Sequence, residues 1–335
     1  MNDKRILITG VGGLIGNHLS RYLLNKGYNV IGIDNLSGSY RDNVDDRLFD
    51  NRQFHPIDLL NIESLNRIIE YYKPDVVFHF AAYAALGLSP FIRNFNYNNN
   101  ILASINVINA CVNYGIRKLV FTSSMDVYGN QGTPFTENMT PMPEDPYGIA
   151  KYAVELDIKE AHNHFGLEYT IVRPHNVVGI YQNIWDKYRN VLGIWIRQII
   201  DNEPITIYGD GSVERAFSDI KYYLLPFEKI ITNFNGEIFN MGSDKVYKLI
   251  DAANIILRVG QDFGYKGNIV YLEPRKEVKF AYSNHNKAKN LLGFEDNTNL
   301  IKVATEMFAW ALSQPKREII KMPYEINKNI YSYWK

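Results

Sequence analysis

The chain has 335 residues, which is enough for two closely joined domains, and its 46% hydrophobic and 21% charged residues permit a sizeable core and exclude wholesale disorder. Its 36 Lys and Arg balance 36 Asp and Glu, which argues against nucleic acid as the main partner, because phosphate backbones are held by an excess of basic residues. The single cysteine, Cys111, cannot form an intramolecular disulfide and fits a reducing, cytoplasmic compartment, and no apolar run reaches the roughly 18 residues of a membrane helix.

Strands and helices alternate through the first half of the chain. The predicted strands are Lys4–Thr9, Asn29–Ile33, Asp75–Phe80, Lys118–Ser123 and Tyr169–Val172. The predicted helices are Leu14–Lys26, Ile62–Tyr72, Asn98–Tyr114 and Tyr147–Phe165. Strands that are separated by helices of about ten or more residues predict a parallel sheet covered on both faces. The sequence therefore predicts an α/β fold with a Rossmann-type doubly wound sheet.

After Val178 the segments become shorter and richer in aromatic residues. We expect residues 1–178 to form a dinucleotide-binding domain, joined by a late strand near residues 236–242. Residues 179–335 then form a smaller C-terminal α/β domain that binds the substrate. No Gly- or Ser-rich linker separates the two parts, so we expect them to pack together with the ligand site in the cleft between them.

A glycine-rich loop follows the first strand and opens the first helix. It contains Gly10, Gly13, Leu14, Ile15 and Gly16. Amide groups at a helix N-terminus bind anions, and the absence of Cβ atoms lets a pyrophosphate approach. Asp34, followed by Asn35, ends the second strand about 20 residues later, where an acid that binds the ribose 2′-hydroxyl belongs. The pattern predicts NAD, while Arg41 close by leaves NADP as the minority alternative.

A tyrosine and a lysine, Tyr147 and Lys151, stand four residues apart on one predicted helix, and hence on one face. We expect the ammonium group to lower the phenol pKa from about 10 toward neutrality, which would let the tyrosine take a proton from a sugar hydroxyl. Ser124 follows the carboxyl end of a predicted strand, and open α/β sheets bind ligands beyond the carboxyl ends of their strands. It could hydrogen-bond the same substrate oxygen.

Taken together, these features resemble the extended short-chain dehydrogenase/reductase superfamily. Within it the chain is most similar to NAD-dependent nucleotide-sugar epimerases and dehydratases, and above all to the UDP-glucose 4-epimerase family. The resemblance implies a catalytic triad of Ser124, Tyr147 and Lys151, with Asn99 as a structural partner. It implies further cofactor contacts at Asp58, Leu59, Phe80, Ala81, Ala82, Asn99, Tyr147 and Lys151. It implies substrate contacts at Asn176, Tyr208, Arg215 and Arg275.

The resemblance also implies the reaction. In a 4-epimerase, Tyr147 takes the C4 hydroxyl proton, hydride passes to NAD⁺, and the 4-keto sugar turns over before hydride returns. Asp126 keeps a second enzyme reading open, because related 4,6-dehydratases and decarboxylases carry an acid there. Met125, which replaces their other acid, weakens that reading. A third alternative is a non-catalytic protein that senses nucleotide sugars or NAD.

Other features of the sequence leave choices open. Asp219 and Lys221 occupy places where the family has an aromatic residue and an acid. Ala281 or Tyr282 stands beside the expected sugar pocket, so the sequence leaves the sugar, its N-acetylation and the nucleotide undecided. We expect no metal site, because His162 and His164 point to different faces of a helix. The resemblance implies a homodimer paired through the helices Asn98–Tyr114 and Tyr147–Phe165, which carry more apolar residues than one buried stripe needs.

Overall fold

A parallel sheet forms the centre of the first half of the computed structural model, which describes residues 2–276 and 278–335. Its strand order is β11-β6-β5-β4-β1-β2-β3, and every neighbouring pair is parallel. The strands are β1 (Asn2–Thr9), β2 (Tyr28–Ile33), β3 (Phe54–His55), β4 (Val76–His79), β5 (Lys118–Thr122), β6 (Glu168–Pro174) and β11 (Glu237–Met241). This confirms the predicted α/β fold with a doubly wound sheet.

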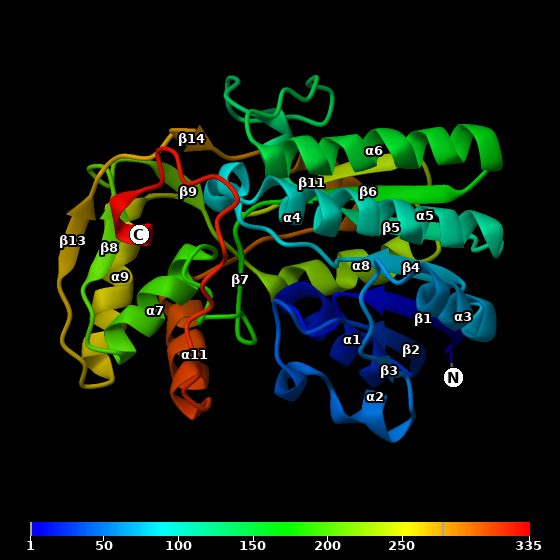
Figure 1. Cartoon of the computed structure of the whole chain (residues 1–335), viewed down its shortest axis with the longest axis horizontal. Helices are drawn as coiled ribbons and strands as arrows, with labels where there is room; N and C mark the ends of the chain where they lie inside the picture. Colours follow the sequence, from blue (N-terminus) through cyan, green and yellow to red (C-terminus); the bar gives the residue numbers. More distant parts are fainter. Residues whose placement is uncertain (1, 277) are drawn as a thin grey trace.

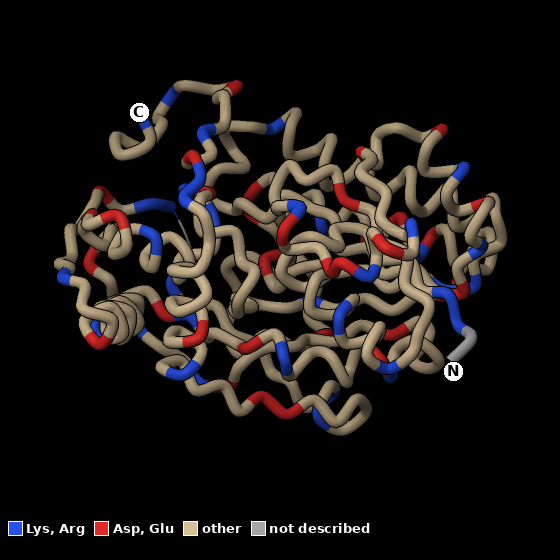
Figure 2. The backbone as a smooth tube through the Cα atoms, turned by 90° about the horizontal axis from the view of Figure 1, so that it is seen from below, with Lys and Arg blue, Asp and Glu red and all other residues tan. Residues whose placement is uncertain are grey.

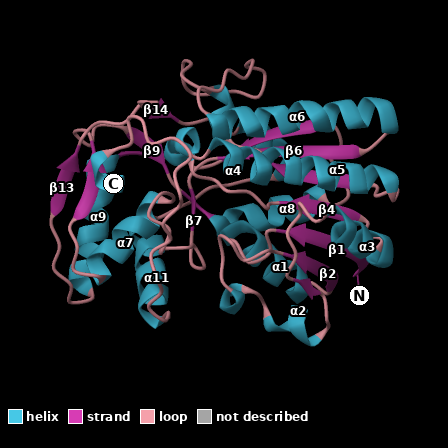
Figure 3. Cartoon of the chain, in the orientation of Figure 1, coloured by secondary structure: helices cyan, strands magenta, loops and turns pink. Residues whose placement is uncertain are grey.

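Helices cover both faces of this sheet (Figures 1 and 3). In β1, Leu7 packs toward one face and Ile6 and Ile8 toward the other, which is why the strand is apolar throughout. The face that Leu7 joins is covered by α3 (Ile62–Tyr72), α5 (Ala103–Asn113) and α6 (Pro146–Phe165). The other face is covered by α1 (Leu14–Asn25), α8 (Leu224–Ile230), α10 (Asn286–Leu292) and the short α2 (Asp46–Asp50).

The helix predicted from Asn98 to Tyr114 begins earlier in the structure. It starts with α4 (Arg93–Tyr97), continues through one π-helical turn at Asn98–Leu102 and ends as α5. Such turns are frequent at functional sites. Within this one, the Asn100 side chain accepts a 2.9 Å hydrogen bond from the Tyr83 amide and donates to the Tyr83 carbonyl. The turn therefore holds the segment after β4 in place.

The second half builds a separate core, seen in Figure 1 at the far side from the N-terminus. Its helices are α7 (Val191–Ile200), α9 (Leu249–Asp262) and α11 (Leu300–Ser313). Its strands are β8 (Ile205–Tyr208), which pairs with β13 (Ile269–Leu272), and β9 (Glu214–Ala216), which lies between β12 (Val246–Lys248) and β14 (Phe280–Ala281). Between the two halves, β7 (Val177–Val178) pairs with β10 (Ser218–Asp219). The elements α8, β11 and α10 return to pack with the first half.

The strand order reverses between β1 and β4, since β2 and β3 follow on one side and β5, β6 and β11 on the other. Open α/β sheets bind ligands beyond the carboxyl ends of the strands at such a point. Basic and acidic residues are interspersed along the backbone (Figure 2). Within residues 2–276 and 278–335, no helix is long and apolar enough to cross a bilayer.

Candidate active site

The turn between β1 and α1 packs its glycines against neighbouring backbone. Gly10 has a φ of +72°, and a Cβ there would lie 2.7 Å from the backbone nitrogen of Ala81. A Cβ on Gly16 would collide with the Gly10 carbonyl. Gly13 occupies the N-cap of α1 and offers no side-chain hydrogen bond. The amides of the first helical turn therefore remain available to an anion, which is what a phosphate-binding turn requires.

Asp34 stands at the carboxyl end of β2 and organises the loop beside the glycines. Its carboxylate accepts hydrogen bonds from the Gly12 amide (2.9 Å), the Leu36 amide (2.8 Å) and the Ser39 hydroxyl (3.1 Å). Burial raises the Asp34 pKa, and the two amide hydrogen bonds oppose that rise. A carboxylate has about four lone-pair positions, so one remains for a ligand hydroxyl.

A first pocket runs along the turn and across the ends of β2 and β4. At its outer end the Asn35 amide donates a 2.9 Å hydrogen bond to the Asp58 carboxylate. The predicted cofactor residues that line this pocket are Gly10, Gly13, Asp34, Asn35, Asp58, Leu59, Phe80, Ala81, Ala82 and Asn99. Asn99 lies in the pocket wall, whereas its neighbours Asn96 and Asn100 make the contacts to the start of α6 and to Tyr83.

A second pocket begins where the first one ends. Besides Gly10, Gly13, Phe80 and Ala82, which it shares with the first pocket, the predicted residues that line it are Leu14, Ile15, Gly16, Ser124, Asp126, Tyr147, Lys151 and Asn176. The structure thus brings the proposed triad, Asp126 and part of the glycine turn to one place. Arg215, Tyr208 and Arg275 are not part of its wall.

The start of α6 fixes the position of Tyr147. Asp145 caps the helix by accepting from the amides of Tyr147 (2.8 Å) and Gly148 (3.1 Å), and Pro146 fills the first helical position, where its missing N–H costs nothing. One turn later, the Lys151 ammonium donates a 2.8 Å hydrogen bond to the Thr122 carbonyl and lies 5.9 Å from the centre of the Tyr147 ring. The two side chains share a helix face, as predicted.

The prediction that Lys151 lowers the Tyr147 pKa is wrong for this structure. Burial, followed by the charge of Asp126, raises the Tyr147 pKa, and a hydrogen bond with Ser124 opposes the rise. Burial also lowers the pKa of Lys151 to about 7. The physical reason is depth: desolvation disfavours both charged forms, and the ammonium is held by a strand carbonyl rather than by the phenol.

Asp126 adds an acidic group to the same pocket. Burial, and then the neighbouring Asp145, raise its pKa well above the usual value. Its Oδ2 atom is fully buried and lies where a Cβ on Gly148 would come within 3.1 Å of it. Two carboxyl groups that share a buried space cannot both ionise easily. The arrangement therefore favours a protonated carboxyl group beside Tyr147.

The predicted substrate residues fall into two places. Asn176, with a φ of +41°, donates a 3.0 Å hydrogen bond to the Ala216 carbonyl. Farther along the second half, the Arg275 guanidinium lies 3.8 Å from the centre of the Tyr208 ring and 5.9 Å from that of Trp334. Arg215 follows Glu214 in β9, and Ala281 is its partner in β14. Trp334, near the C-terminus, thus lies beside Arg275, a feature that no sequence motif indicates.

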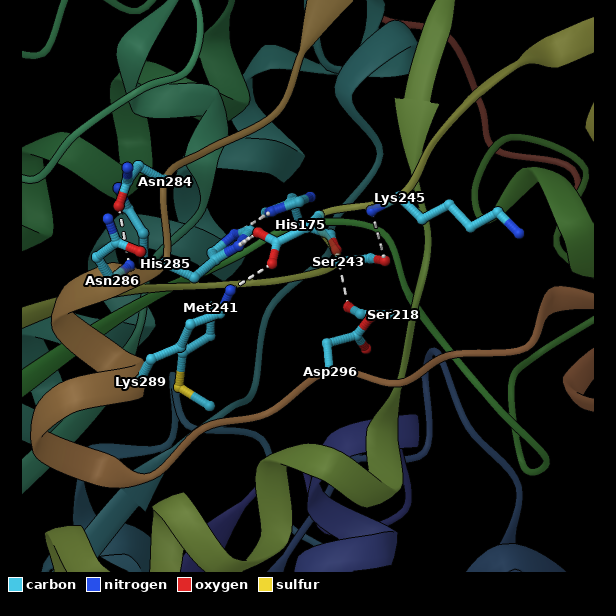
Figure 4. A network of polar contacts seen from close by, with 12 residues as sticks. His175, Ser218, Met241, Ser243, Lys245, Asn284, His285, Asn286, Lys289 and Asp296 are labelled. Carbon is cyan, nitrogen blue, oxygen red and sulfur yellow. Dashed lines mark hydrogen bonds and ion pairs between the residues drawn. The ribbon is translucent and has the colours of Figure 1, made fainter.

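A pair of buried histidines supports the segment that carries Asn176 (Figure 4). His175 Nε2 lies 2.8 Å from His285 Nε2, and His285 Nδ1 lies 2.8 Å from an Asp244 carboxylate oxygen. Since that carboxylate accepts a hydrogen bond from His285 Nδ1–H, the Nε2 atom of a neutral His285 accepts a hydrogen bond from His175 Nε2–H. Burial lowers the pKa of His175 to about 3, which keeps the pair uncharged.

Sequence reasoning missed two charged groups near the site. Glu155 and Arg173, 0% and 1% exposed, form a paired hydrogen bond one turn beyond Lys151. Arg189 lines both pockets. A buried charge on a helix or strand otherwise rich in apolar residues was a signal for the first pair, whereas Arg189 lies in a loop without a motif. His162 and His164 make separate contacts, and the described residues contain no cluster of three or more His, Cys, Asp or Glu suited to a metal ion.

Comparison with known proteins identifies the family. Residues 6–242 match the NAD dependent epimerase/dehydratase family. The chain belongs to that family. The UDP-glucuronate 4-epimerase of Thermodesulfobacterium geofontis is 30% identical over 325 residues, which cover 94% of this chain and 98% of that protein. The UDP-glucose 4-epimerase of Caenorhabditis elegans is 29% identical over 93% of this chain and 98% of its own length.

Solved structures of similar proteins show the same architecture. A UDP-glucose 4-epimerase from Thermotoga maritima, determined with UDP-glucose, has a TM-score of 0.84 at 28% identity and covers 92% of this chain and 98% of its own. A UDP-N-acetylglucosamine 4-epimerase from Methanobrevibacter ruminantium has a TM-score of 0.85 at 29% identity, with 94% and 100% covered. As a member of the epimerase/dehydratase family, the chain is an NAD-dependent enzyme.

Proposed function

We propose that the enzyme is a UDP-sugar 4-epimerase. The observation that carries the proposal is the second pocket, in which Ser124, Tyr147 and Lys151 meet beside the glycine turn. The similar proteins named above, which span nearly the whole chain, are 4-epimerases of three different UDP-sugars. The nucleotide is therefore UDP in this proposal, and the sugar is a hexose whose C4 hydroxyl reaches Tyr147.

The two pockets fit NAD. The turn at Gly10, Gly13 and Gly16 leaves helix amides for a pyrophosphate, and Asp34 keeps an acceptor position for a ribose hydroxyl. Asn35, Asp58 and Leu59 border the adenosine end, while Tyr147 and Lys151 border the nicotinamide end. When bound, NAD supplies a hydride acceptor and donor.

Tyr147 carries the proton chemistry in this proposal. Its phenolate oxygen would take the proton of the substrate C4 hydroxyl, and Ser124 would hold the same substrate oxygen by a hydrogen bond. The raised pKa of Tyr147 means that the ligand-free site keeps the phenol protonated. An oxidised nicotinamide is cationic, so its presence favours the phenolate. Lys151, with a pKa of about 7, can exchange a proton near neutral pH.

The substrate residues anchor the nucleotide while the sugar turns. Arg215 and Arg275 supply guanidinium groups for the diphosphate, because a planar fork forms paired, charge-assisted hydrogen bonds with phosphate oxygens. Tyr208 supports Arg275 by stacking beneath it at 3.8 Å. Asn176 faces the second pocket, where the sugar is expected.

Product analysis tests the proposal directly. The purified protein is incubated separately with UDP-glucose, UDP-glucuronate and UDP-N-acetylglucosamine, and the products are resolved by chromatography. We expect at least one C4 epimer without added reductant. The wild-type protein is compared with Tyr147→Phe, which should form none. If no UDP-sugar is epimerised while NAD remains bound, the 4-epimerase proposal is wrong and the non-catalytic reading is supported.

The same experiment separates the dehydratase reading from epimerisation. A 4,6-dehydratase or decarboxylase would use Asp126 as an additional acid. The 4-keto-6-deoxy product of a dehydratase absorbs in alkali whereas an epimer does not, and a decarboxylase would release CO2. We expect no such absorbance, because Met125 stands in place of the second acid. An alkali-absorbing product that disappears in Asp126→Asn would overturn the epimerase assignment.

We also propose a cytoplasmic homodimer. Large apolar side chains are exposed on the two adjacent helical segments, with Leu102 49%, Ile149 42% and Leu156 49% exposed. The single cysteine, Cys111, is free and buried, as suits a reducing compartment. Light scattering should give twice the chain mass, and Leu156→Glu should shift it toward the monomer. Tyr71→Glu, at a 78% exposed position on α3, is the matched control. A monomeric wild type would refute the dimer.

A further inference from the structure

The two pockets of the site are parts of one groove. The residues common to both walls are Gly10, Gly13, Gly38, Phe80, Ala82 and Arg189. Two of these belong to the glycine turn, whose helix amides suit phosphate. Arg189 is the one charged member of the shared set. It comes from the second half of the chain, two residues before α7.

Arg189 is held rigidly by its neighbours. Its Nε donates a 2.7 Å hydrogen bond to Asp186, a fully buried carboxylate, and the guanidinium lies 4.5 Å from the centre of the Tyr83 ring. Its Nη2 donates a 3.2 Å hydrogen bond to the Gly38 carbonyl. A Cβ on Gly38 would lie only 2.5 Å from Nη2, so the glycine makes room for the guanidinium.

These contacts leave one donor group directed elsewhere. Within the described residues, Nη1 makes no hydrogen bond, yet it is not among the buried side-chain atoms that lack a partner. It is therefore open to the groove. A guanidinium whose Nε and Nη2 groups already donate can still offer its Nη1 group to a phosphate oxygen.

Electrostatics place Arg189 midway along the groove. Burial raises the pKa of Asp34 at the adenosine end and that of Tyr147 at the nicotinamide end, and the charge of Arg189 opposes both rises, so both groups lie within its field. A dinucleotide that spans from one to the other carries its two negative phosphates between them. The middle of the groove is where the shared residues lie.

We propose that Arg189 binds the pyrophosphate of NAD and so retains the cofactor, acting from the second half of the chain while the glycine turn acts from the first. This rests on the NAD dependence of the family and not on which sugar is the substrate. Because the second half also carries the substrate residues Tyr208, Arg215 and Arg275, a cofactor held by Arg189 links both halves. An enzyme without net redox change benefits from a cofactor that stays bound.

Binding measurements on cofactor-free protein test the role of Arg189. Calorimetry is performed with NAD, ADP-ribose and adenosine for the wild type and for Arg189→Met. We expect Arg189→Met to weaken NAD and ADP-ribose by about ten- to a hundredfold, the value of a hydrogen bond to a charged group, and to leave adenosine within about twofold. Arg189→Lys should recover part of the loss, since it keeps the charge but not the fork.

Controls separate phosphate binding from folding. Arg189→Met leaves the buried Asp186 carboxylate without its cation. The double variant Asp186→Asn with Arg189→Met is therefore measured as well and should show the same selective loss. Lys187→Met, a neighbouring cation outside both pocket walls, should bind all three ligands like the wild type.

Unchanged NAD affinity in both Arg189 variants would overturn the proposal. So would an equal loss for adenosine, which would show that Arg189 only shapes the loop at Gly38. Because these readouts need no sugar substrate, a failure of the 4-epimerase proposal would leave them interpretable.

Discussion

Removing the charge of Glu155 should show how much the buried Glu155–Arg173 ion pair contributes to the stability of the protein. Glu155 and Arg173 are 0% and 1% exposed, and the guanidinium donates at 2.8 Å and 2.5 Å to the two carboxylate oxygens. The Ser123 hydroxyl donates to the same carboxylate, and Arg173 donates at 2.8 Å to Tyr128. Ser123 and Arg173 therefore both donate hydrogen bonds that depend on the negative charge of Glu155.

The expected cost of Glu155→Leu follows from the charge that it leaves behind. Breaking a buried ion pair by removing one partner costs about 3–5 kcal/mol, because the other charge stays buried without compensation. At 1.4 kcal/mol per factor of ten, the unfolding equilibrium constant should rise by about a hundredfold to a few thousandfold. The double variant Glu155→Leu with Arg173→Met removes both charges, so it should be less destabilised than the single variant.

Urea denaturation followed by tryptophan fluorescence measures these differences. A loss below about 1 kcal/mol in Glu155→Leu, or a double variant as unstable as the sum of both single ones, would refute the reasoning. A second readout concerns Lys151, since the Glu155 charge raises its pKa. In Glu155→Gln the high-pH limb of the activity profile should therefore move to lower pH if Lys151 must carry its proton.

Three further predictions concern the catalytic group, acid stability and the C-terminal residues. Tyr147→Phe should lower kcat by at least about a hundredfold, the usual worth of a positioned acid–base group, while the purified protein keeps its NAD absorbance; an unchanged kcat would remove Tyr147 from the mechanism. Burial lowers the pKa of both His79 and His175 from 6.5 to about 3 in the folded protein. When the pH falls below 6.5, these histidines therefore take up protons in the unfolded chain but not in the folded one. Stability is thus fully present above pH 6.5 and should fall by about 1 kcal/mol per histidine between about pH 6.5 and 5.5 in urea titrations; a constant stability over this range would refute the prediction. Trp334→Ala should raise the UDP-sugar KM several-fold with little change in kcat, because Arg275 loses a neighbouring ring; an unchanged KM would disconnect the C-terminal residues from substrate binding.

The sequence predicts elements well where local patterns decide them. It predicts α3 from Ile62 to Tyr72, and the structure has the same bounds. The helix predicted to begin at Asn98 begins at Arg93 in the structure. The sequence does not show this, because the asparagine-rich segment has a low helix propensity. Its helical state depends on tertiary contacts, in which the Asn100 side chain holds the backbone of Tyr83. No local pattern carries that information.

In the site too, local spacing predicts some features, and others depend on tertiary packing. Spacing four residues apart places Tyr147 and Lys151 on one face, but it says nothing about depth or about the Thr122 carbonyl that holds the ammonium. The direction of the Tyr147 pKa therefore required the structure. Arg189 was missed for a related reason: its place in the groove results from the packing of Asp186, Tyr83 and Gly38, which are far apart in the sequence.

The protonation of the site and the binding of its cofactor are linked. Burial raises the pKa of both Tyr147 and Asp126, which favours the neutral form of each acid. A cationic nicotinamide favours the phenolate, and by thermodynamic reciprocity the phenolate must favour the oxidised over the reduced cofactor by the same free energy. The phenol that would take the proton of the substrate hydroxyl thus also favours the oxidised cofactor that the reaction needs at its start. Beside a reduced, uncharged nicotinamide, the protonated form of Tyr147 would be favoured, and it could return its proton to the sugar oxygen.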